Sequence, residues 1–335
     1  MVHRFISARR PKLTPEVMGK IAAAWEARNE NHDQTLQSLI RQWRSRNPSR
    51  PSSPEWTALA ISTKRTWGSA LDMIETKWGE VPLAVFNDPR MKAKVFAWRD
   101  SRRNTPRAAD IGVTVLRALL KFGVQRGRLT INMAADIPAI YRNGQRADIV
   151  WLSDDLERFA SVANAAVIDA VRLACLTGLR CADLADLRWN EVGDKAIIRM
   201  AQKASKGKRR RAMVSMTAGL QSLLQELRAR RRKVDVDTVL VTSEGNSWSP
   251  GGLGKRVGEA SKKAGIIHSD GRKKHLHDCR GTYATHLMIA GATDQEIARA
   301  MAWSPEKVAD IRLVYVDQAR TVVALGERLA AKAVN

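Results

Sequence analysis

Three histidines, a cysteine, a tyrosine and an arginine are gathered in the segment HLHDCRGTYATHLM at residues 275–288. The chain holds only six His, three Cys and three Tyr in its 335 residues, so this density is unusual. Side chains of these types can bind a metal ion, serve a nucleophile or bind a phosphate group. Their spacing must decide among these three kinds of site.

A zinc site is disfavoured by the spacing of its candidate ligands. His275, His277, Cys279 and His286 do not follow the intervals of structural zinc sites, and no second Cys/His pair follows. A histidine that acts as a general base needs a Ser or Cys partner, and the surrounding sequence marks none. His277 and Arg280 lie three residues apart and so on one helical face. We predict an outward-facing cation pair suited to an anion.

The segment LTGLRCADLADLRW at residues 176–189 is a second candidate. Its four leucines are predicted to face the core, namely Leu176, Leu179, Leu184 and Leu187. Thr177 and Gly178 interrupt the helical pattern, after which Arg180 opens a new helix with Asp183 one turn later. Taken alone, the segment could equally be an amphipathic helix with a surface arginine.

Tyr315 is a third candidate, near the C-terminal end in the segment RLVYVDQARTVVALGERLAAKA at residues 312–333. An amphipathic helix is predicted directly after it, over residues 318–333. A single tyrosine in such a place is most often a packing residue. Its position therefore becomes informative only together with the other segments.

The charge of the chain indicates a polyanionic partner. Its formal net charge is +23 and its isoelectric point is about 10.6. Residues 1–148 hold 26 Lys and Arg against 13 Asp and Glu, and residues 149–335 hold 31 against 21. Such an excess repels itself unless a partner neutralises it. Its presence in both halves favours two domains that grip one long anion.

Several classes of protein are disfavoured by what the sequence lacks. Three cysteines without a CxxC pair make no disulfide framework. The chain has no apolar signal segment and no run of about 18 apolar residues. We expect reduced thiols, no membrane contact and a cytoplasmic, nucleoid-associated protein. Neither a GxxxxGK[ST] loop nor an acidic metal cluster is present, so neither a metal nor any other cofactor is expected.

The expected fold class is mainly α, in two domains. Residues 1–31 form a basic N-terminal extension, residues 32–143 an all-helical domain and residues 144–148 a polar linker. Residues 149–335 form a second, mostly helical domain. Two β-prone runs at 196–200 and 212–216 flank a basic turn there and predict an antiparallel hairpin.

Individual helices are predicted from periodicity and capping residues. Residues 63–79 place Trp67, Leu71, Ile74 and Trp78 on one apolar face. Asp110 is expected to cap a helix that Gly127 ends, and Ser153 is expected to cap the first helix after the linker.

The order of these segments resembles the tyrosine recombinase, or phage integrase, family over most of the chain. TGLRCADLADLRW is similar to the family's T-G-x-R-x-x-E-L-x-x-L-x-W box, with Asp183 where Glu or Asp is usual. HLHDCRGTYATHL is similar to its H-x-L-R box, with Cys279 in place of Leu. Trp303 stands where His is common, and Trp is a known alternative. Tyr315 follows by 12 residues, so the loop that delivers it is expected to be longer than usual.

The resemblance implies a fold and a function. Residues 32–143 would be the core-binding domain, and residues 149–335 would have the catalytic fold of DNA breaking-rejoining enzymes. The chain would be a site-specific DNA strand transferase that integrates or excises a phage or genomic island through a 3′-phosphotyrosyl intermediate. It would act as a tetramer on double-stranded DNA, with accessory DNA-bending or directionality proteins as further candidate partners. The C-terminal helix would dock on a neighbouring protomer or on its own core.

The resemblance also assigns roles to single residues. Tyr315 would be the nucleophile, and the other catalytic residues would be Arg180, Arg280, His277, Lys203 and Trp303. Asp183 would orient Arg180 or His277, and the basic hairpin would bind DNA through Lys206, Lys208, Arg209 and Arg210. Two guanidiniums are physically suited to this reaction, because its phosphorane gains negative charge on the non-bridging oxygens.

Three other functions compete with this one. A type IB topoisomerase uses similar chemistry as a monomer and relaxes supercoils without strand exchange. A non-catalytic DNA-binding regulator would not need every catalytic position filled. A helical protein that binds an acidic ligand would form no covalent adduct with DNA.

Overall fold

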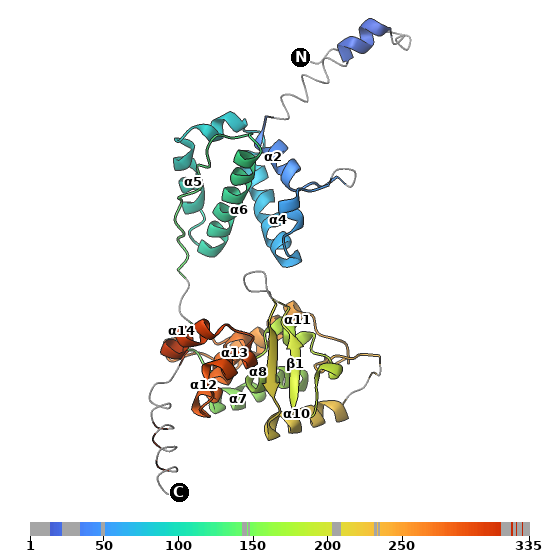
Figure 1. Cartoon of the computed structure of the whole chain (residues 1–335), viewed down its shortest axis with the longest axis vertical. Coiled ribbons are helices and arrows are strands. Elements are labelled where there is room, and N and C mark those ends of the chain that lie inside the picture. Colours follow the sequence, from blue (N-terminus) through green and yellow to red (C-terminus); the bar gives the residue numbers. More distant parts are fainter. Residues whose placement is uncertain are drawn as a thin grey trace. The chain divides into compact units, whose positions relative to one another are not determined.

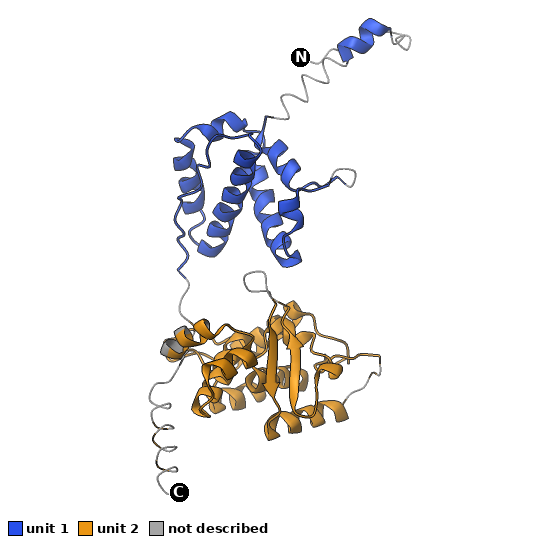
Figure 2. Ribbon diagram, in the orientation of Figure 1, with its two compact units in different colours: residues 1–143 blue, residues 144–335 orange. Residues whose placement is uncertain are grey.

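The computed structural model describes residues 14–21, 34–47, 51–142, 146, 148–202, 209–230, 233, 235–315, 323, 326 and 330. The chain divides into two compact units, residues 1–143 and residues 144–335 (Figure 2). As predicted, the described part of the chain is mainly helical, with one small antiparallel sheet. No helix among the described residues is long and apolar enough to cross a membrane.

Helices and their connecting segments make up the described part of unit 1, which has no β-strand (Figure 1). A short helix at residues 15–21 is followed by α2 (Leu36–Trp43), α3 (Pro54–Thr57), α4 (Ile61–Trp78), η1 (Leu83–Asn87), α5 (Met91–Asp100) and α6 (Pro106–Gln125). Helix α6 packs against α2, α4 and α5. The predicted apolar face of α4 is confirmed, since Leu71, Ile74 and Trp78 are buried and Trp67 is half-buried.

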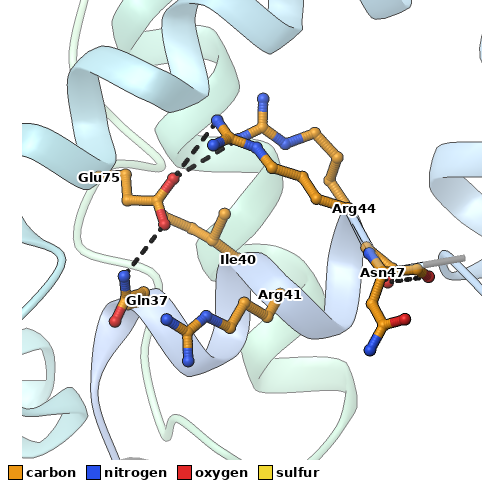
Figure 3. Close-up of a pocket in the computed structure, with 8 residues that line it drawn as sticks. Gln37, Ile40, Arg41, Arg44, Asn47 and Glu75 are labelled. Atoms are coloured by element: carbon orange, nitrogen blue, oxygen red, sulfur yellow. Dashed lines mark hydrogen bonds and ion pairs between the residues drawn. The ribbon is translucent and has the colours of Figure 1, made fainter. Parts of the chain in front are cut away.

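A cavity of about 550 Å³ lies where residues after α2 reach α4 (Figure 3). Arg44 and Arg46 both pair with Asp72, at 2.7 and 2.5 Å. The Glu75 carboxylate lies between the Gln37 amide, which donates to it at 3.3 Å, and the Arg44 guanidinium at 3.6 Å. These polar contacts hold α2 on α4 beside the buried core. They also balance the charge of two arginines at the cavity.

The prediction that Asp110 caps a helix is wrong. Helix α6 begins at Pro106, where proline is tolerated because the first helical N–H has no partner within the helix. Asp110 therefore lies inside the helix, and its carboxylate accepts from the backbone N–H groups of Ile140 and Tyr141, at 3.0 and 2.7 Å. It holds the segment that leaves unit 1. Gly127 does follow the end of the helix, with φ of +67°.

We expect Asp110→Ala to loosen this exit segment without unfolding unit 1. Loss of the carboxylate leaves two backbone donors unpaired, which costs about 1 kcal/mol each. Hydrogen exchange at the amides of Ile140 and Tyr141 should accelerate about tenfold. Asp110→Asn keeps one acceptor oxygen and serves as the control. Unchanged exchange in the alanine variant would show that other contacts hold the segment.

Unit 2 surrounds the central helix α8 (Ala165–Thr177). Its other elements are α7 (Ser153–Ala160), α9 (Cys181–Ala185), η2 (Trp189–Glu191), β1 (Ala196–Met200), β2 (Arg211–Ser215), α10 (Ala218–Ala229), α11 (Pro250–Lys263), η3 (Leu276–Asp278), α12 (Cys279–Ile289), α13 (Asp294–Met301) and α14 (Pro305–Tyr315). Helices α10, α11 and α12 pack on α8, and α13 packs on β2 (Figure 1).

The predicted hairpin is confirmed, with strand bounds shifted by one residue at β2. β1 and β2 pair antiparallel, in a register that places Ala196 opposite Ser215 and Met200 opposite Arg211. Helix α7 differs slightly from its prediction, because it begins at Ser153 and Leu152 occupies the capping position. There the Asp155 carboxylate accepts from the Leu152 N–H at 2.8 Å.

Helix α14 replaces the loop that was expected between Trp303 and Tyr315. Val308 and Ile311 are buried, and the helix packs against α12 and α13. The Arg312 guanidinium pairs with Asp294 at the start of α13, at 2.5 Å. The predicted C-terminal helix at 318–333 lies outside the described residues except for residues 323, 326 and 330, which are helical.

Candidate active site

Arg280 is the centre of the site, and its side chain points into the unit. It is only 3% exposed at the start of α12. Its guanidinium donates to the Gly178 carbonyl and, at 2.9 Å, to the Met301 carbonyl. The prediction of an outward-facing cation pair is therefore wrong for Arg280. The reason is that two backbone carbonyls from distant segments offer a charged donor strong hydrogen bonds.

Gly178 brings the first of these carbonyls into place. It ends α8 with φ of +59°, a left-handed conformation that favours glycine. A Cβ atom there would lie 2.5 Å from the Tyr283 ring and 2.8 Å from the Met301 sulfur. From the sequence, this glycine was predicted only to interrupt the helical pattern. The signal that was available is its place at the end of a helical pattern, where a left-handed cap is common.

We expect Gly178→Ala to destabilise unit 2 by about 3 kcal/mol, from left-handed strain and overpacking together. Gly265→Ala is the matched control, because Gly265 has a similar φ of +62° but no atom within 4 Å of an added Cβ. It should cost about 1 kcal/mol. Hydrogen exchange of α8 and α12 measures both. Equal losses in the two variants would mean that the close approach to Tyr283 and Met301 is unimportant.

Trp303 lies beside Arg280. It is 6% exposed, and the Arg280 guanidinium carbon lies 5.3 Å from the centroid of its ring. The backbone turns here because Ala302 adopts φ of +51°, the single positive φ of a non-glycine residue in the described chain. Arg210, before β2, donates to the Trp303 carbonyl at 3.2 Å. The hairpin base is thus tied to the same place.

Arg180 and Asp183 lie at the start of α9. The side chain of Arg180 is 22% exposed, and it lies 3.9 Å from the carboxylate of Asp183, which is 2% exposed. The same carboxylate accepts from the backbone N–H of Gln202 at 2.9 Å. Gln202 lies two residues after the end of β1. Asp183 therefore links the Arg180 segment to the hairpin turn.

His277 is exposed in the short helix η3, just before Arg280. The two residues therefore do not share one helical face. The His277 side chain is exposed and the Arg280 side chain is buried, so the two lie at different depths in unit 2. Their backbones are close because η3 runs directly into α12.

The remaining predicted residues are placed less fully. Lys203, Lys206 and Lys208 lie outside the described residues, and Arg209 is exposed. Tyr315 is the last residue of α14, and its side chain lies outside the described part of the chain. Because α14 packs against α12, the helix that ends at Tyr315 contacts the helix that carries Arg280.

Two other candidate nucleophiles are disfavoured by burial. Burial raises the pKa of the Cys279 thiol well above its usual value. Burial likewise raises the pKa of Tyr283 to about 12. Neither group ionises readily near neutral pH, so neither is activated for attack.

One group of possible metal ligands occurs among the described residues. Ligand atoms of Asp148, His268 and Asp270 lie within 4.8 Å of one another. The Arg272 guanidinium pairs with both carboxylates, so one of their two negative charges is already offset and both are engaged. We assign no metal there. The group does not include the histidines of residues 275–286.

Comparisons with known proteins identify the family of this chain and show similar folds. Residues 150–318 match the model of the phage integrase family. The fold is similar to a lambda integrase dimer bound to a COC′ core site, with 16% identity, a TM-score of 0.65 and coverage of 87% of this chain and 94% of that one. A search of curated proteins found no match.

Two further solved structures have the same fold. A lambda integrase tetramer bound to a Holliday junction is 14% identical, with a TM-score of 0.65 and coverage of 90% of this chain and 88% of that one. The Tn1549 transposon integrase in complex with circular intermediate DNA is 15% identical, with a TM-score of 0.63 and coverage of 83% and 95%.

Proposed function

This chain belongs to the phage integrase family of tyrosine recombinases, and we propose that it cuts and rejoins duplex DNA through a covalent 3′-phosphotyrosyl intermediate. The observation that best supports this proposal is the pair of hydrogen bonds from the buried Arg280 guanidinium to the Gly178 and Met301 carbonyls. They join the segments that hold Arg180, Arg280 and Trp303. Those segments are spread over more than 100 residues, since Arg280 lies 102 residues from Gly178.

The proposed reaction is an exchange of phosphate esters. The phenol oxygen of Tyr315 attacks phosphorus and gives up its proton, while the bond from phosphorus to the 5′ oxygen breaks. The DNA 3′ phosphate is then joined to the tyrosine, and the departing strand carries a 5′ hydroxyl. Rejoining reverses these steps with the 5′ hydroxyl of another strand. Because the ester bond is conserved, no nucleotide hydrolysis is needed.

Arg180 and Arg280 would stabilise the phosphorane between attack and departure. Each guanidinium is permanently charged and planar, so it can donate two hydrogen bonds to non-bridging oxygens. A preorganised donor of this kind lowers a barrier by about 3 kcal/mol. Trp303 would pack against Arg280 and support its orientation.

Two further groups would handle protons. Lys203, on the hairpin turn, would protonate the departing 5′ oxygen, with Lys206 and Lys208 as the alternatives. His277 would donate to the phosphate or assist removal of the phenol proton. Asp183, buried between the Arg180 segment and Gln202, would orient the donors and would not meet the phosphate.

The substrate would be double-stranded DNA that contacts both basic units. Arg209 and Arg210 at the hairpin base would contribute phosphate contacts, which makes binding strongly salt-dependent. Assembly as a tetramer on DNA is supported by the similar fold of the lambda integrase tetramer on a Holliday junction. The biological role would be integration or excision of a phage or genomic island, with accessory DNA-bending or directionality proteins as further partners.

Incubation of the chain with a nicked duplex tests the proposal. Cleavage beside the nick releases a short strand, which diffuses away. The protein then stays covalently trapped on the DNA, because the strand needed for rejoining is gone. We expect a protein–DNA band that survives denaturant. When two DNA sites are supplied, a recombinase gives strand-exchange products. A topoisomerase would give none and would only relax a supercoiled plasmid. A protein that binds the duplex and never becomes covalently attached contradicts the proposal.

A further inference from the structure

A buried arginine that was not predicted to be catalytic lies next to Asp183. Arg199 occupies an inward-facing position of β1, two residues after the fully buried Ile197, and is 4% exposed. Strand alternation predicts an apolar residue at such a position. A buried guanidinium costs several kcal/mol unless it is paired and hydrogen-bonded. Its presence there therefore requires an explanation from its neighbours.

Three carboxylates surround this guanidinium. Arg199 donates to Glu191 at 2.5 Å and to Asp186 at 2.7 Å, and it also donates to the Asp186 carbonyl at 2.9 Å. Asp183 lies 3.5 Å from its Nε atom. Burial opposes the charge of Arg199, but the carboxylates outweigh it and raise the arginine's pKa. The arginine thus remains charged inside the unit.

Two of these carboxylates also hold the residue that begins the hairpin turn. Asp183 accepts from the Gln202 backbone N–H at 2.9 Å, and Asp186 accepts from the Gln202 side-chain amide at 2.9 Å. Gln202 immediately precedes Lys203 in the sequence. The contact from Asp183 to Arg180 is longer, at 3.9 Å. The carboxylates that contact Arg199 therefore hold Gln202 more closely than they hold Arg180.

We propose that Arg199 is a positioning residue that holds Asp183 and Asp186 in place and thereby fixes Gln202, the residue directly before Lys203, the proposed general acid of strand cleavage. This inference rests on the proposed function and on Lys203 as that acid. Without Arg199, the buried Asp183 loses a cation beside it and the link to Gln202 loses its support. A misplacement of about 1 Å can cost about 100-fold in rate.

The test compares Arg199→Met with wild-type protein on two nicked duplexes. One has ordinary DNA, and the other has sulfur in place of the departing 5′ oxygen. A thiolate leaves without protonation, since thiols have a pKa of about 8.5. We expect Arg199→Met to slow cleavage of ordinary DNA about 100-fold at saturating DNA. On the sulfur-containing DNA it should react within about threefold of wild type, because the acid is no longer needed.

Two other variants keep the test decisive. Arg172→Met is the matched control: Arg172 pairs with Glu226 at 2.9 Å on another part of unit 2, and its loss should leave both rates unchanged. Gln202→Ala removes the Asp186 link from an exposed side chain, so it should fold even if Arg199→Met does not. It should slow ordinary cleavage by about tenfold, and the sulfur-containing DNA should restore its rate.

The outcomes distinguish a failure of this inference from a failure of the proposed function. Wild-type protein that forms no adduct on either DNA refutes the proposed function, and the inference falls with it. If wild type cleaves and folded Arg199→Met cleaves equally fast, only the inference fails. If Arg199→Met or Gln202→Ala is slow on both DNAs, the variant acts through something other than the general acid, and the inference is wrong.

Discussion

Tyr315→Phe should form no covalent adduct with a nicked duplex, while it still binds that duplex with wild-type affinity. The substitution removes the single oxygen that would attack phosphorus and leaves the aromatic ring in place. A variant without its nucleophile has no alternative route to the covalent step, so we expect a loss of about 10⁴-fold or more. The measurement is the protein–DNA band after denaturation, alongside a binding titration on the same DNA.

The two other tyrosines of the chain supply the controls. Tyr283→Phe keeps a ring that packs beside Gly178 in unit 2 and loses only a hydroxyl whose pKa is raised by burial. Tyr141→Phe makes the same change in unit 1. Both should form the adduct at the wild-type rate. An adduct that persists in Tyr315→Phe and disappears in either control would assign the nucleophile to a different tyrosine.

Arg280→Gln should abolish cleavage and also destabilise unit 2, whereas Arg180→Gln should abolish cleavage alone. Arg280 is buried, and its removal leaves the Gly178 and Met301 carbonyls without their charged donor. Hydrogen bonds from charged groups contribute about 1.5–3 kcal/mol each, so we expect unit 2 to lose about 3 kcal/mol or more. Arg180 is partly exposed with one long ion pair, which contributes at most about 1 kcal/mol.

Adduct formation and hydrogen exchange of α8 and α12 measure the two effects separately. Each arginine variant should reduce adduct formation by about 100-fold or more. Only Arg280→Gln should accelerate exchange across the unit. The assignment of Arg280 to both roles is wrong if its variant retains wild-type protection, and the catalytic assignment of Arg180 is wrong if its variant cleaves normally.

Short-range patterns were sufficient to predict much of this fold. The apolar face of α4, the antiparallel hairpin and the break between Thr177 and Arg180 all follow from spacing within one element. Capping was predicted less well, because Pro106 allows α6 to start before Asp110. Helix α14 was not predicted, because it depends on packing against α12 and α13 and not on the spacing between Trp303 and Tyr315.

The sequence predicted which residues could form the candidate site, but it did not predict how those residues are arranged. Three-residue spacing places His277 and Arg280 on one face only if both belong to the same helix, and His277 lies in η3. The link from Asp183 to Gln202 and the buried Arg199 behind it were also missed. The available signal was an arginine at an inward position of a predicted strand.

The sequence alone determined the helical composition, the hairpin, the basic charge of both halves and the order of the candidate catalytic residues. Each of these depends on neighbouring residues or on sums over the chain. Only the tertiary structure decided that Arg280 points inward to carbonyls 102 and 21 residues away, and that Asp183 accepts from the Gln202 backbone N–H. A side chain turns toward the nearest strong acceptor, and the folded backbone fixes where that acceptor lies.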